Sequence, residues 1–510
     1  MVRTRKPKID WPAVYKIVDD AKVEAIPEDH HSRLRATLKL IENHLTPQER
    51  SSEKASDLTN SGGEESPTKS DKPEKEPKKG GQGRNSAADQ IGAKRNPISH
   101  PTLSHGGCCP DCDKGKVYKC KKPGLVPRFE AQPLIAATIH ELERLKCNFC
   151  SAVFVAPLPE NLGTEKYDES VTAVLGTSRY GAGLPSYRLE GFLKQFGILI
   201  PDSTQWALLW EGASLLKPLH AALLRYGADC RNLYGDDTGG KVLHLKRTLP
   251  GRTGTFTTAI VGEGTEGKVA LYFTGEKHAG ENLADVLKLR VSNEQPIVMF
   301  DALSRNVPKG VDILLCNCLA HGRRNFAKII GTFPEECTHL LTQLGLVYFH
   351  DAESKKQGLS PEGRLAYHQM MSQPILEELH SWAASLIDSA SEPNSLLGKA
   401  LAYLLKHWKA LTEFLRTPGA ALDNNICERA IKKVVLYRKN SLFYRTENGA
   451  AAADIYMSII HTCELNQIPA FPYLVALLKN ADKVLKDPEQ WLPWTYQASL
   501  AALFPEAPSG

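Results

Sequence analysis

Five short segments between residues 230 and 320 have the spacing of β-strands. Each is either continuously apolar or alternates apolar and polar residues, and a glycine-rich turn separates the second from the third, as in a hairpin. The segments are 233–236, 255–261, 268–273, 297–300 and 313–316. A helical pattern over 281–289 lies between the third and the fourth. One strand, a hairpin, a helix and two more strands is the order of a ribonuclease-H-like core, in which the first and fourth strands are neighbours.

Elsewhere the apolar residues recur at steps of three and four, which predicts helices. Residues 8–50 carry one such stripe, 166–228 contain several helices, and 335–415 predict a helical insertion in the core. Within 166–228, Gly197 separates two helical segments, and Ser203-Thr204 are predicted to cap the second. This is the outline of a helix-turn-helix that reads DNA, although helical hairpins of this kind also serve packing alone.

Two CxxC pairs predict a metal site near the end of the first third of the chain. Paired CxxC turns bring four thiolates around one tetrahedral Zn²⁺ ion and leave no open position, so the ion would be structural. The predicted ligands are Cys109, Cys112, Cys147 and Cys150. Unrelated buried thiols are the alternative, but these rarely fall into two such pairs.

These patterns predict a multidomain α/β protein with a ribonuclease-H-like mixed sheet. The stretch 51–95 contains only two large apolar residues, so it predicts a flexible linker that cannot form a core. The predicted organisation is an N-terminal helical region (1–50), a low-complexity linker (51–100), a zinc-ribbon-like module (101–158), a helical, helix-turn-helix-like DNA-binding candidate (159–229), the first part of the catalytic core (230–334), the helical insertion (335–415), the rest of the core (416–465) and a C-terminal helical tail (466–510).

Composition and charge narrow the compartment and the partners. With 42% hydrophobic residues, the 510-residue chain can bury several cores, whereas its net charge of +5 does not by itself indicate a polyanionic partner. Basic residues concentrate in patches such as 114–122 and 432–439, which suit a phosphate backbone or are ordinary solvated surface. No apolar stretch reaches the length of a membrane span, and no signal peptide is visible. We therefore expect no membrane partner and a cytoplasmic protein that joins the nucleoid when it binds DNA.

Three acidic residues lie where the predicted core would gather them. Asp236 ends the first strand, Asp301 follows the fourth, and Glu428 lies near the start of a predicted helix. Carboxylates are the ligands that Mg²⁺ prefers, and two ions about 4 Å apart stabilise both the attacking and the leaving oxygen in phosphodiester cleavage. We predict that the three acids hold two Mg²⁺ (or Mn²⁺) ions, with Asp236 bridging them. Any one of these acids alone would more often be a surface or capping residue.

Asp237 competes with Asp236 for the first position, because adjacent strand residues point to opposite faces and only one can face the ions. Basic residues after the fifth strand and around the third acid are predicted to contact DNA phosphates. They are His321, Arg323, Arg324, Arg429, Arg438 and Lys439. Asn424 and Asn425 are expected to cap the helix that carries Glu428.

Several runs of the sequence resemble the insertion-sequence-66 family of bacterial transposases. The run 317–326 resembles that family's C-x-A-H-x-R-R-x-F motif, and 423–430 with 438–443 resembles the region of its third acid. The two CxxC pairs and the runs 184–188 and 492–494 are similar to further family features, so the resemblance covers roughly residues 100–500. The chain departs from the family where Asp236-Asp237-Thr238-Gly239 replaces Asp-Glu-Thr-Pro and Asp301-Ala302-Leu303 replaces Asp-Gly-Tyr.

The resemblance implies that Asp236, Asp301 and Glu428 are a DDE triad. The protein would then bind the ends of an insertion sequence, cut donor DNA and transfer the 3′ ends to target DNA with Mg²⁺. Enzymes that pair two DNA ends commonly assemble on them, so we expect a homo-oligomer on DNA, with accessory proteins of the same element as further candidate partners. Two alternatives stay open: a catalytically inactive DNA-binding regulator, and a host nuclease that cleaves without strand transfer.

Overall fold

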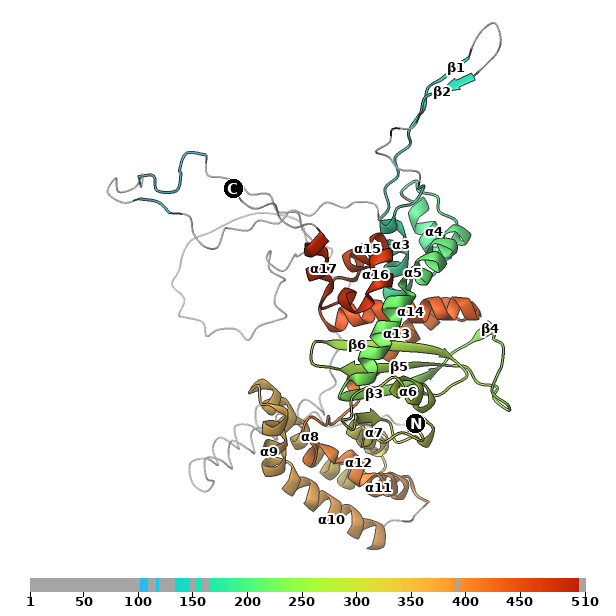
Figure 1. Ribbon diagram of the computed structural model, residues 1–510. Helices are drawn as coiled ribbons and strands as arrows, with labels where there is room; N and C mark the ends of the chain where they lie inside the picture. The colour runs from blue at the N-terminus through green and yellow to red at the C-terminus, as the bar shows by residue number, and fades with distance from the viewer. Residues whose placement is uncertain are drawn as a thin grey trace, which may run out of the picture. The chain divides into compact units, whose positions relative to one another are not determined.

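The computed structural model describes residues 101–108, 116–118, 134–146, 153–157, 159, 165–389, 392 and 394–503 (Figure 1). The chain divides into two compact units, Glu49–Pro133 and Met1–Gln48 with Leu134–Gly510. Every helix and strand of the described residues belongs to the second unit. The predicted N-terminal helix, the linker and the four zinc-binding cysteines lie outside the described residues.

Strands are short and mostly fall where the apolar runs predict them. They are β1 (Arg144–Lys146), β2 (Val153–Val155), β3 (Asn232–Gly239), β4 (Val242–His244), β5 (Phe256–Glu263), β6 (Lys268–Gly275), β7 (Ile297–Phe300), β8 (Leu314–Asn317) and β9 (Tyr444–Thr446).

Helices occupy most of the remaining described chain. The α-helices are α3 (Glu169–Gly176), α4 (Ser186–Lys194), α5 (Asp202–Asp229), α6 (Ala279–Leu287), α7 (Leu319–Ile329), α8 (Pro334–Lys356), α9 (Pro361–Met371), α10 (Gln373–Ser389), α11 (Leu396–Lys406), α12 (Trp408–Leu411), α13 (Asn425–Ser441), α14 (Glu447–Leu465), α15 (Ala470–Lys479), α16 (Ala481–Lys486) and α17 (Tyr496–Leu503). Short 3₁₀ or π segments are η4 (Thr177–Gly181), η5 (Ser304–Asn306), η6 (Glu413–Leu415) and η7 (Pro488–Trp491).

Five strands form one mixed sheet in the order β6-β5-β3-β7-β8. Strand β5 runs antiparallel to both β3 and β6, while β7 and β8 run parallel to β3. The predicted adjacency of the first and fourth strands, β3 and β7, is confirmed. A five-stranded mixed sheet surrounded by helices is compatible with the predicted ribonuclease-H-like core.

Alternation along β3 sends consecutive side chains to opposite faces of the sheet. Asp237 stands opposite Thr258 of β5, and both face α6, where Asn282 donates a hydrogen bond to the Thr258 hydroxyl at 2.8 Å. Asp236 stands opposite Ala259 and faces the other side, where α13 packs on β3 and β5. The register therefore decides which of the two adjacent acids faces α13.

Helix α14 protects the outer edge of the sheet. Strand β6 is an edge strand, and unpaired N–H groups at an edge invite pairing with other chains. Side chains spaced four residues apart on α14 and its C-cap accept these N–H bonds at 2.7–3.0 Å. The pairs, written acceptor to donor, are Asp454 to Thr274, Ser458 to Tyr272, Thr462 to Ala270 and Asn466 to Lys268.

The predicted helical insertion is a group of helices that lies between α7 and α13. Helices α8 to α12 and η6 fill residues 334–415, and α7 packs against α8 and α11 (Figure 1). The insertion therefore rests on the helix that follows the last strand of the sheet.

Helices α4 and α5 correspond to the predicted helical pair. Gly197 makes the turn between them with a φ of +75°. The predicted cap at Ser203-Thr204 is wrong, because α5 begins at Asp202 after Pro201 and has no side-chain cap. DNA reading by this pair stays a prediction.

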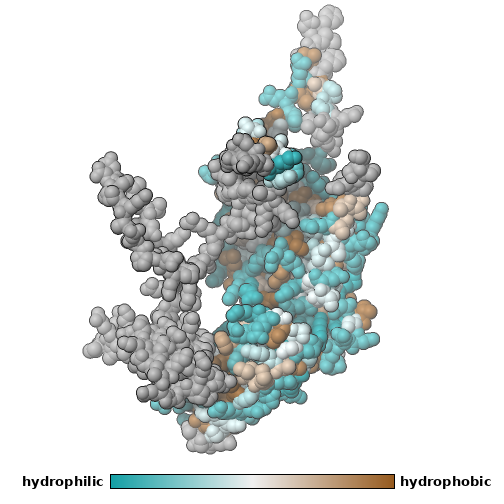
Figure 2. Space-filling view, turned by 90° about the vertical axis from the view of Figure 1, so that its left-hand side faces the viewer, coloured by the Kyte–Doolittle hydropathy of each residue, from teal (hydrophilic) through white to brown (hydrophobic). Residues whose placement is uncertain are grey.

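The face of the molecule in Figure 2 is largely hydrophilic where residues are coloured, with small scattered apolar areas. Among the described residues, no helix combines the length and the apolar character that a membrane span requires.

Candidate active site

Two of the three predicted acids lie side by side on paired strands. Asp301 directly follows β7, whereas Asp236 lies inside β3, which continues to Gly239, so the prediction that Asp236 ends its strand is wrong. In the parallel pair of β3 and β7, Tyr234 stands opposite Met299. Two residues further along each strand come Asp236 and Asp301, so the same register brings them to one edge of the sheet. Glu428 comes from the first turns of α13, which packs on β3.

The electrostatics of Asp236 show that the acids are close together. Burial raises the pKa of Asp236 to about 7, and the negative charges of Asp301, Asp237 and Glu428 add to the increase. Among the described residues, no basic side chain forms an ion pair with Asp236 or Asp301. The fold thus concentrates negative charge at this position without balancing it.

A glycine makes the close approach of the two strands possible. A Cβ atom on Gly235 would lie 2.0 Å from Cε1 of Phe300, so any side chain at residue 235 would collide with that ring. Phe300 is fully buried and immediately precedes Asp301, as Gly235 precedes Asp236. The packing of this pair therefore positions both acids.

Asn424 connects the helix of the third acid to the strand of the first. It is fully buried, and its Nδ2 donates a hydrogen bond of 2.9 Å to the carbonyl oxygen of Gly235. The predicted capping by Asn424 and Asn425 is wrong: Asn424 occupies the N-cap position without a capping bond, and Oδ1 of Asp423 accepts the N–H of Asn425 at 3.1 Å. Asn424 is better described as a positioning residue for Glu428.

Asp301 is held by the loop that follows it. Nδ2 of the buried Asn306, in η5, donates to Oδ1 of Asp301 at 2.7 Å. Burial raises the pKa of Tyr403, in α11, to about 12, and the charge of Asp301 contributes to this increase. The helical insertion therefore reaches the surroundings of Asp301.

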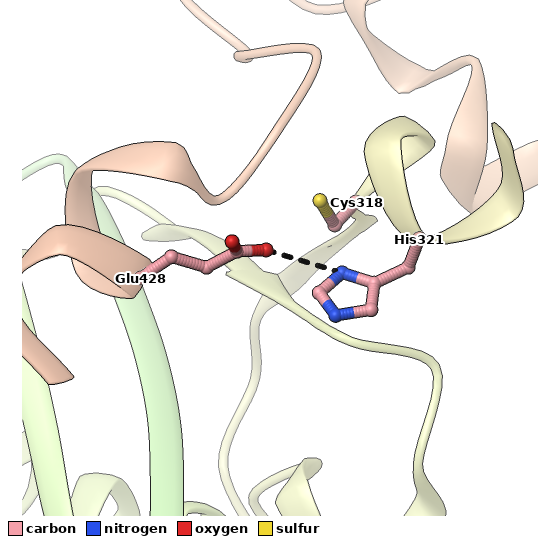
Figure 3. A group of neighbouring side chains, drawn as sticks. All are labelled: Cys318, His321 and Glu428. Atoms are coloured by element: carbon pink, nitrogen blue, oxygen red, sulfur yellow. Dashed lines mark ion pairs between the residues drawn. The ribbon is translucent and has the colours of Figure 1, made fainter. Parts of the chain in front are cut away.

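Glu428 faces the start of α7. Its Oε1 lies 3.6 Å from Nδ1 of His321 and 3.4 Å from Nη2 of Arg324. Figure 3 shows Glu428 and His321 pointing toward each other from their two helices. Burial and the charge of Arg324 lower the pKa of His321, whereas the charges of Glu428 and Asp301 oppose this decrease. Two of the predicted basic residues are therefore neighbours of the third acid.

Cys318 completes a group of three ligand types with His321 and Glu428. The three ligand atoms all lie within 4.8 Å of one another (Figure 3). Burial raises the pKa of the Cys318 thiol to about 11, and its Sγ accepts the N–H of Asn424 at 3.2 Å. Sulfur is a soft ligand, whereas Mg²⁺ prefers carboxylate oxygens, so a Mg²⁺ site is better assigned to the carboxylates.

Asp237 faces away from the other three acids. Its Oδ2 lies 2.9 Å from Nδ1 of His278, the residue before α6, and its side chain is only 5% exposed. Arg305 is a more distant neighbour at 3.8 Å. Asp237 thus has partners of its own, which Asp236 lacks.

A comparison with known sequences decides the family. The sequence pattern of the Transposase IS66 family matches residues 165–452, which is more than half of the chain and contains all three acids. The chain belongs to the IS66 family of transposases.

Relatives of the IS66-family protein occur in Sinorhizobium fredii. The protein y4hP is 25% identical over 387 residues, which cover 71% of this chain and 68% of that protein. The protein y4jD is 26% identical over 373 residues, which cover 70% and 71% of the two chains. Both are named uncharacterized proteins, so the transposase-type function of this chain rests on the family.

The remaining basic residues predicted to contact DNA are distributed along α7 and α13. Arg323 is partly buried, and Arg429 and Lys439 are exposed. Arg438 instead ties α13 to the end of β3, because its Nη1 donates to the Thr238 hydroxyl at 3.1 Å and to the carbonyl of Gly239. Arg438 is therefore engaged in the fold, whereas Arg429 and Lys439 are available at the surface.

The donor set of the three acids fits a hard divalent cation. Asp236, Asp301 and Glu428 offer only carboxylate oxygens, which Mg²⁺ and Mn²⁺ prefer. Burial, together with the neighbouring negative charges, raises the pKa of Asp236, and a bound cation would offset both effects. Membership of a transposase family likewise implies divalent metal use in general.

Sequence reasoning missed the residues that hold the acids. Asn306 and His278 gave no signal, since a lone asparagine in a loop suggests a turn and a lone histidine before a helix suggests nothing specific. Asn424 gave the wrong signal, that of a cap. Only the glycine before Asp236 could have been read as a position of close backbone approach.

Proposed function

We propose that this IS66-family protein is a DDE transposase, which binds the ends of an insertion sequence, cleaves DNA and transfers the 3′ ends to target DNA. The observation that carries the proposal is the pair Asp236 and Asp301, which has no ion-pair partner among the described residues and lies beside Glu428; the pKa of Asp236 is raised to about 7. Burying an acid without a basic partner lowers the free energy of unfolding, and acids in such surroundings occur most often at functional sites.

In this proposal Asp236, Asp301 and Glu428 hold two Mg²⁺ ions. The bound ions would polarise the phosphodiester, lower the pKa of the attacking water or 3′-hydroxyl and neutralise the leaving oxygen. Asn306 fixes the orientation of Asp301, and Asn424 fixes the helix of Glu428 against β3. These contacts preorganise the acids before DNA arrives.

His321 and Arg324 have a second role in the proposal. Both lie within 4 Å of Glu428, and the side chain of Arg324 is 48% exposed. Arg324 can therefore leave the carboxylate and bind a DNA phosphate when cations occupy the acids. His321 is 26% exposed and limits how far Glu428 can move.

The experiment incubates the protein with labelled DNA that carries the native element's ends, in the presence of Mg²⁺ or Mn²⁺. We expect cleaved and joined products with the unmodified protein and none with Glu428→Ala. Asp237→Asn is the matched control, because it neutralises an adjacent acid that faces α6; we expect its cleavage rate to stay within about tenfold of the unmodified protein.

Other outcomes separate the alternatives. DNA binding without chemistry in the unmodified protein would favour the regulator, and cleavage without joining would favour a nuclease. Cleavage that persists in Glu428→Ala would mean that Glu428 is not the third acid. Loss of cleavage in Asp237→Asn with retention in Asp236→Asn would exchange the roles of these two.

Assembly and partners depend on the same proposal. Joining two ends requires that both be held at once, so a homo-oligomer on DNA is expected, and accessory proteins of the same element remain candidates. Mass measurement with and without end DNA tests this, and a monomer under both conditions would contradict it. The structural Zn²⁺ and the cytoplasmic, nucleoid-associated location are also part of this proposal.

A further inference from the structure

A pocket of about 440 Å³ lies on the α6 side of the sheet, behind Asp237. Its walls are one side of α6 with the two residues before it, the loop after Asp301, and Arg252 from the segment before β5. The lining residues are Arg252, Lys277, His278, Gly280, Glu281, Ala284, Asp285, Lys288, Arg305, Val307 and Lys309. Five of them are lysine or arginine and two are acidic, so the pocket is basic although it adjoins a group of acids.

Most of these charges are already paired. Arg252 binds Glu281 through two contacts of 2.6 and 2.7 Å. Lys277 and Lys288 share Asp285, the latter at 2.7 Å. Each of these three cations therefore has an acid in contact, although Lys277 and Lys288 share one.

Arg305 and Lys309 are the exceptions. The side chain of Arg305 is 52% exposed, and its nearest acid, Asp237, is 3.8 Å away and also contacts His278 at 2.9 Å. Lys309 is exposed and has no ion-pair partner among the residues that the structure describes. Two cations on one short loop therefore face a pocket without a strong acidic partner.

The same loop holds a predicted catalytic acid. Arg305 directly precedes Asn306, whose amide donates to Asp301 at 2.7 Å. The loop packs tightly on α6, because a Cβ on Gly280 would lie 2.7 Å from the carbonyl oxygen of Val307 and 2.9 Å from that of Arg305. Binding of an anion by Arg305 would therefore stabilise the loop conformation that orients Asp301.

We propose that this pocket binds a backbone phosphate of the DNA strand that leads to the three acids, with Arg305 and Lys309 as its ligands. The proposal rests on the proposed function. A pocket of this volume accommodates a nucleotide-sized group, and exposed arginine and lysine are the usual phosphate ligands. The phosphate contact offsets the repulsion between the DNA strand and the acids. It also stabilises the loop in which Asn306 donates a hydrogen bond to Asp301.

The first measurement is the affinity for end DNA as a function of salt. Neutralising one phosphate contact lowers the slope of log K against log[salt] by about 1. We expect Arg305→Ala and Lys309→Ala each to weaken binding by about fivefold to tenfold and to reduce the slope by about 1. Lys288→Ala is the matched control, since its side chain is 70% exposed at the same pocket but is neutralised by Asp285; we expect affinity and slope to stay unchanged.

The second measurement locates the phosphate. End DNA with a single neutral methylphosphonate is scanned along the strand, and one position near the cleavage site should weaken binding to the unmodified protein by about fivefold to tenfold. The same substitution should have a smaller effect on Arg305→Ala, where only Lys309 still contacts the phosphate, and no effect on the double variant Arg305→Ala/Lys309→Ala.

The outcomes distinguish this proposal from the proposed function. Normal cleavage by the unmodified protein, with slopes unchanged in Arg305→Ala and Lys309→Ala, would overturn the phosphate site and leave the transposase intact. Methylphosphonate effects that persist undiminished in Arg305→Ala would also overturn it. A protein that neither binds nor cuts end DNA would overturn both.

Discussion

Two regions of this protein shield an aspartate from solvent, and the surroundings shift the pKa of the two carboxyl groups in opposite directions. In the sheet, Asp236 lies among other acids, and burial with the neighbouring charges raises its pKa to about 7. In the helical insertion, Asp351 of α8 is also buried, and burial by itself would raise its pKa. The nearby His368 and the hydrogen bonds and positive charges of Lys355 and Arg364 outweigh that effect and hold the pKa of Asp351 well below its usual range.

The contrast distinguishes a structural acid from a functional one. Asp351 lies 2.6 Å from Lys355, 2.7 Å from Arg364 and 3.5 Å from His368, so the chain itself supplies its partners. Among the described residues, Asp236 has only the backbone N–H of Asp237, at 2.8 Å. An acid whose charge is not balanced within the described part of the chain is a candidate ligand for a group from outside the fold, such as a cation.

The strongest way to break the comparison is to neutralise Asp236. If the Asp236 carboxylate is kept away from solvent and basic partners in order to bind metal, Asp236→Asn should reduce DNA cleavage on the order of 10³-fold or more, because a bridging ligand is lost. The same change should raise the free energy of unfolding of metal-free protein by about 1–2 kcal/mol, because one desolvated negative charge is removed from a group of like charges. Cleavage assays and denaturant unfolding in EDTA measure the two effects.

Activity and stability must move in opposite directions if Asp236 is a functional acid. Addition of Mg²⁺ should stabilise the unmodified protein by more than it stabilises Asp236→Asn. A variant that is less stable by about 1 kcal/mol or more, in EDTA, would show that Asp236 is a structural acid like Asp351.

Neutralising Asp351 should give the reverse result. Asp351→Asn leaves the buried His368 and the partly buried Arg364 without their acid, so we expect a loss of about 3 kcal/mol in the free energy of unfolding. The folded-state pKa of Asp351 is depressed, so its stabilisation is present above the ordinary pKa of about 4 and is lost as the pH falls through the folded value. The difference in the free energy of unfolding between the unmodified protein and Asp351→Asn should therefore have its full value at pH 7 and decrease at acidic pH.

Glu353→Gln is the control for this measurement. Glu353 lies on the same helix and pairs with Lys356 at 3.5 Å, but Lys356 is 77% exposed, so the change should stay within about 0.5 kcal/mol. Equal losses in Glu353→Gln and Asp351→Asn would mean that the network around Asp351 adds nothing beyond ordinary surface pairs.

Much of the sheet could be predicted from the sequence, because its strands are short, buried and separated by clear turns. β7 consists of four buried residues and coincides with a continuous apolar run. The protection of the edge could not be predicted, because Ser458 and Thr462 on α14 look like ordinary polar helix positions. Their partners on β6 lie 186 and 192 residues away in the sequence, and nothing local specifies such a pairing.

In the candidate site, the three acids were predictable from the sequence, but the residues that position them were not. The three acids stand out because each follows or begins a recognisable element, and the family resemblance selects the same residues. The residues that contact the acids do not stand out, because the contacts join distant parts of the sequence. Asn424 and Gly235 are 189 residues apart, and His278 and Asp237 are 41 residues apart. The choice between Asp236 and Asp237 needed the register of β3 against β5, which one sequence cannot supply.

The smallest expected effect concerns a third kind of acid. Asp454 on α14 accepts the N–H and the hydroxyl of Thr274, both at 2.7 Å, so it has hydrogen-bond donors but no cation. Burial raises its pKa to about 7, although the two hydrogen bonds oppose that increase. Asp454 thus lies between the unbalanced Asp236 and the fully paired Asp351.

The stability contributed by the protonated form of Asp454 is fully present below its ordinary pKa of about 4 and is lost as the pH rises through 7. Asparagine mimics that protonated form, with an oxygen for the Thr274 N–H and an NH₂ for its hydroxyl oxygen. We therefore expect the free energy of unfolding of Asp454→Asn, relative to the unmodified protein, to increase by about 2–3 kcal/mol between pH 5 and pH 8.5. Unfolding at both pH values measures this, and Thr462→Val, which also alters the β6 edge but does not titrate, should show the same difference at each pH. A relative stability of Asp454→Asn that does not change between the two pH values would mean that the two donors of Thr274 compensate the charge of Asp454, and that hydrogen bonds alone can serve where Asp351 uses cations.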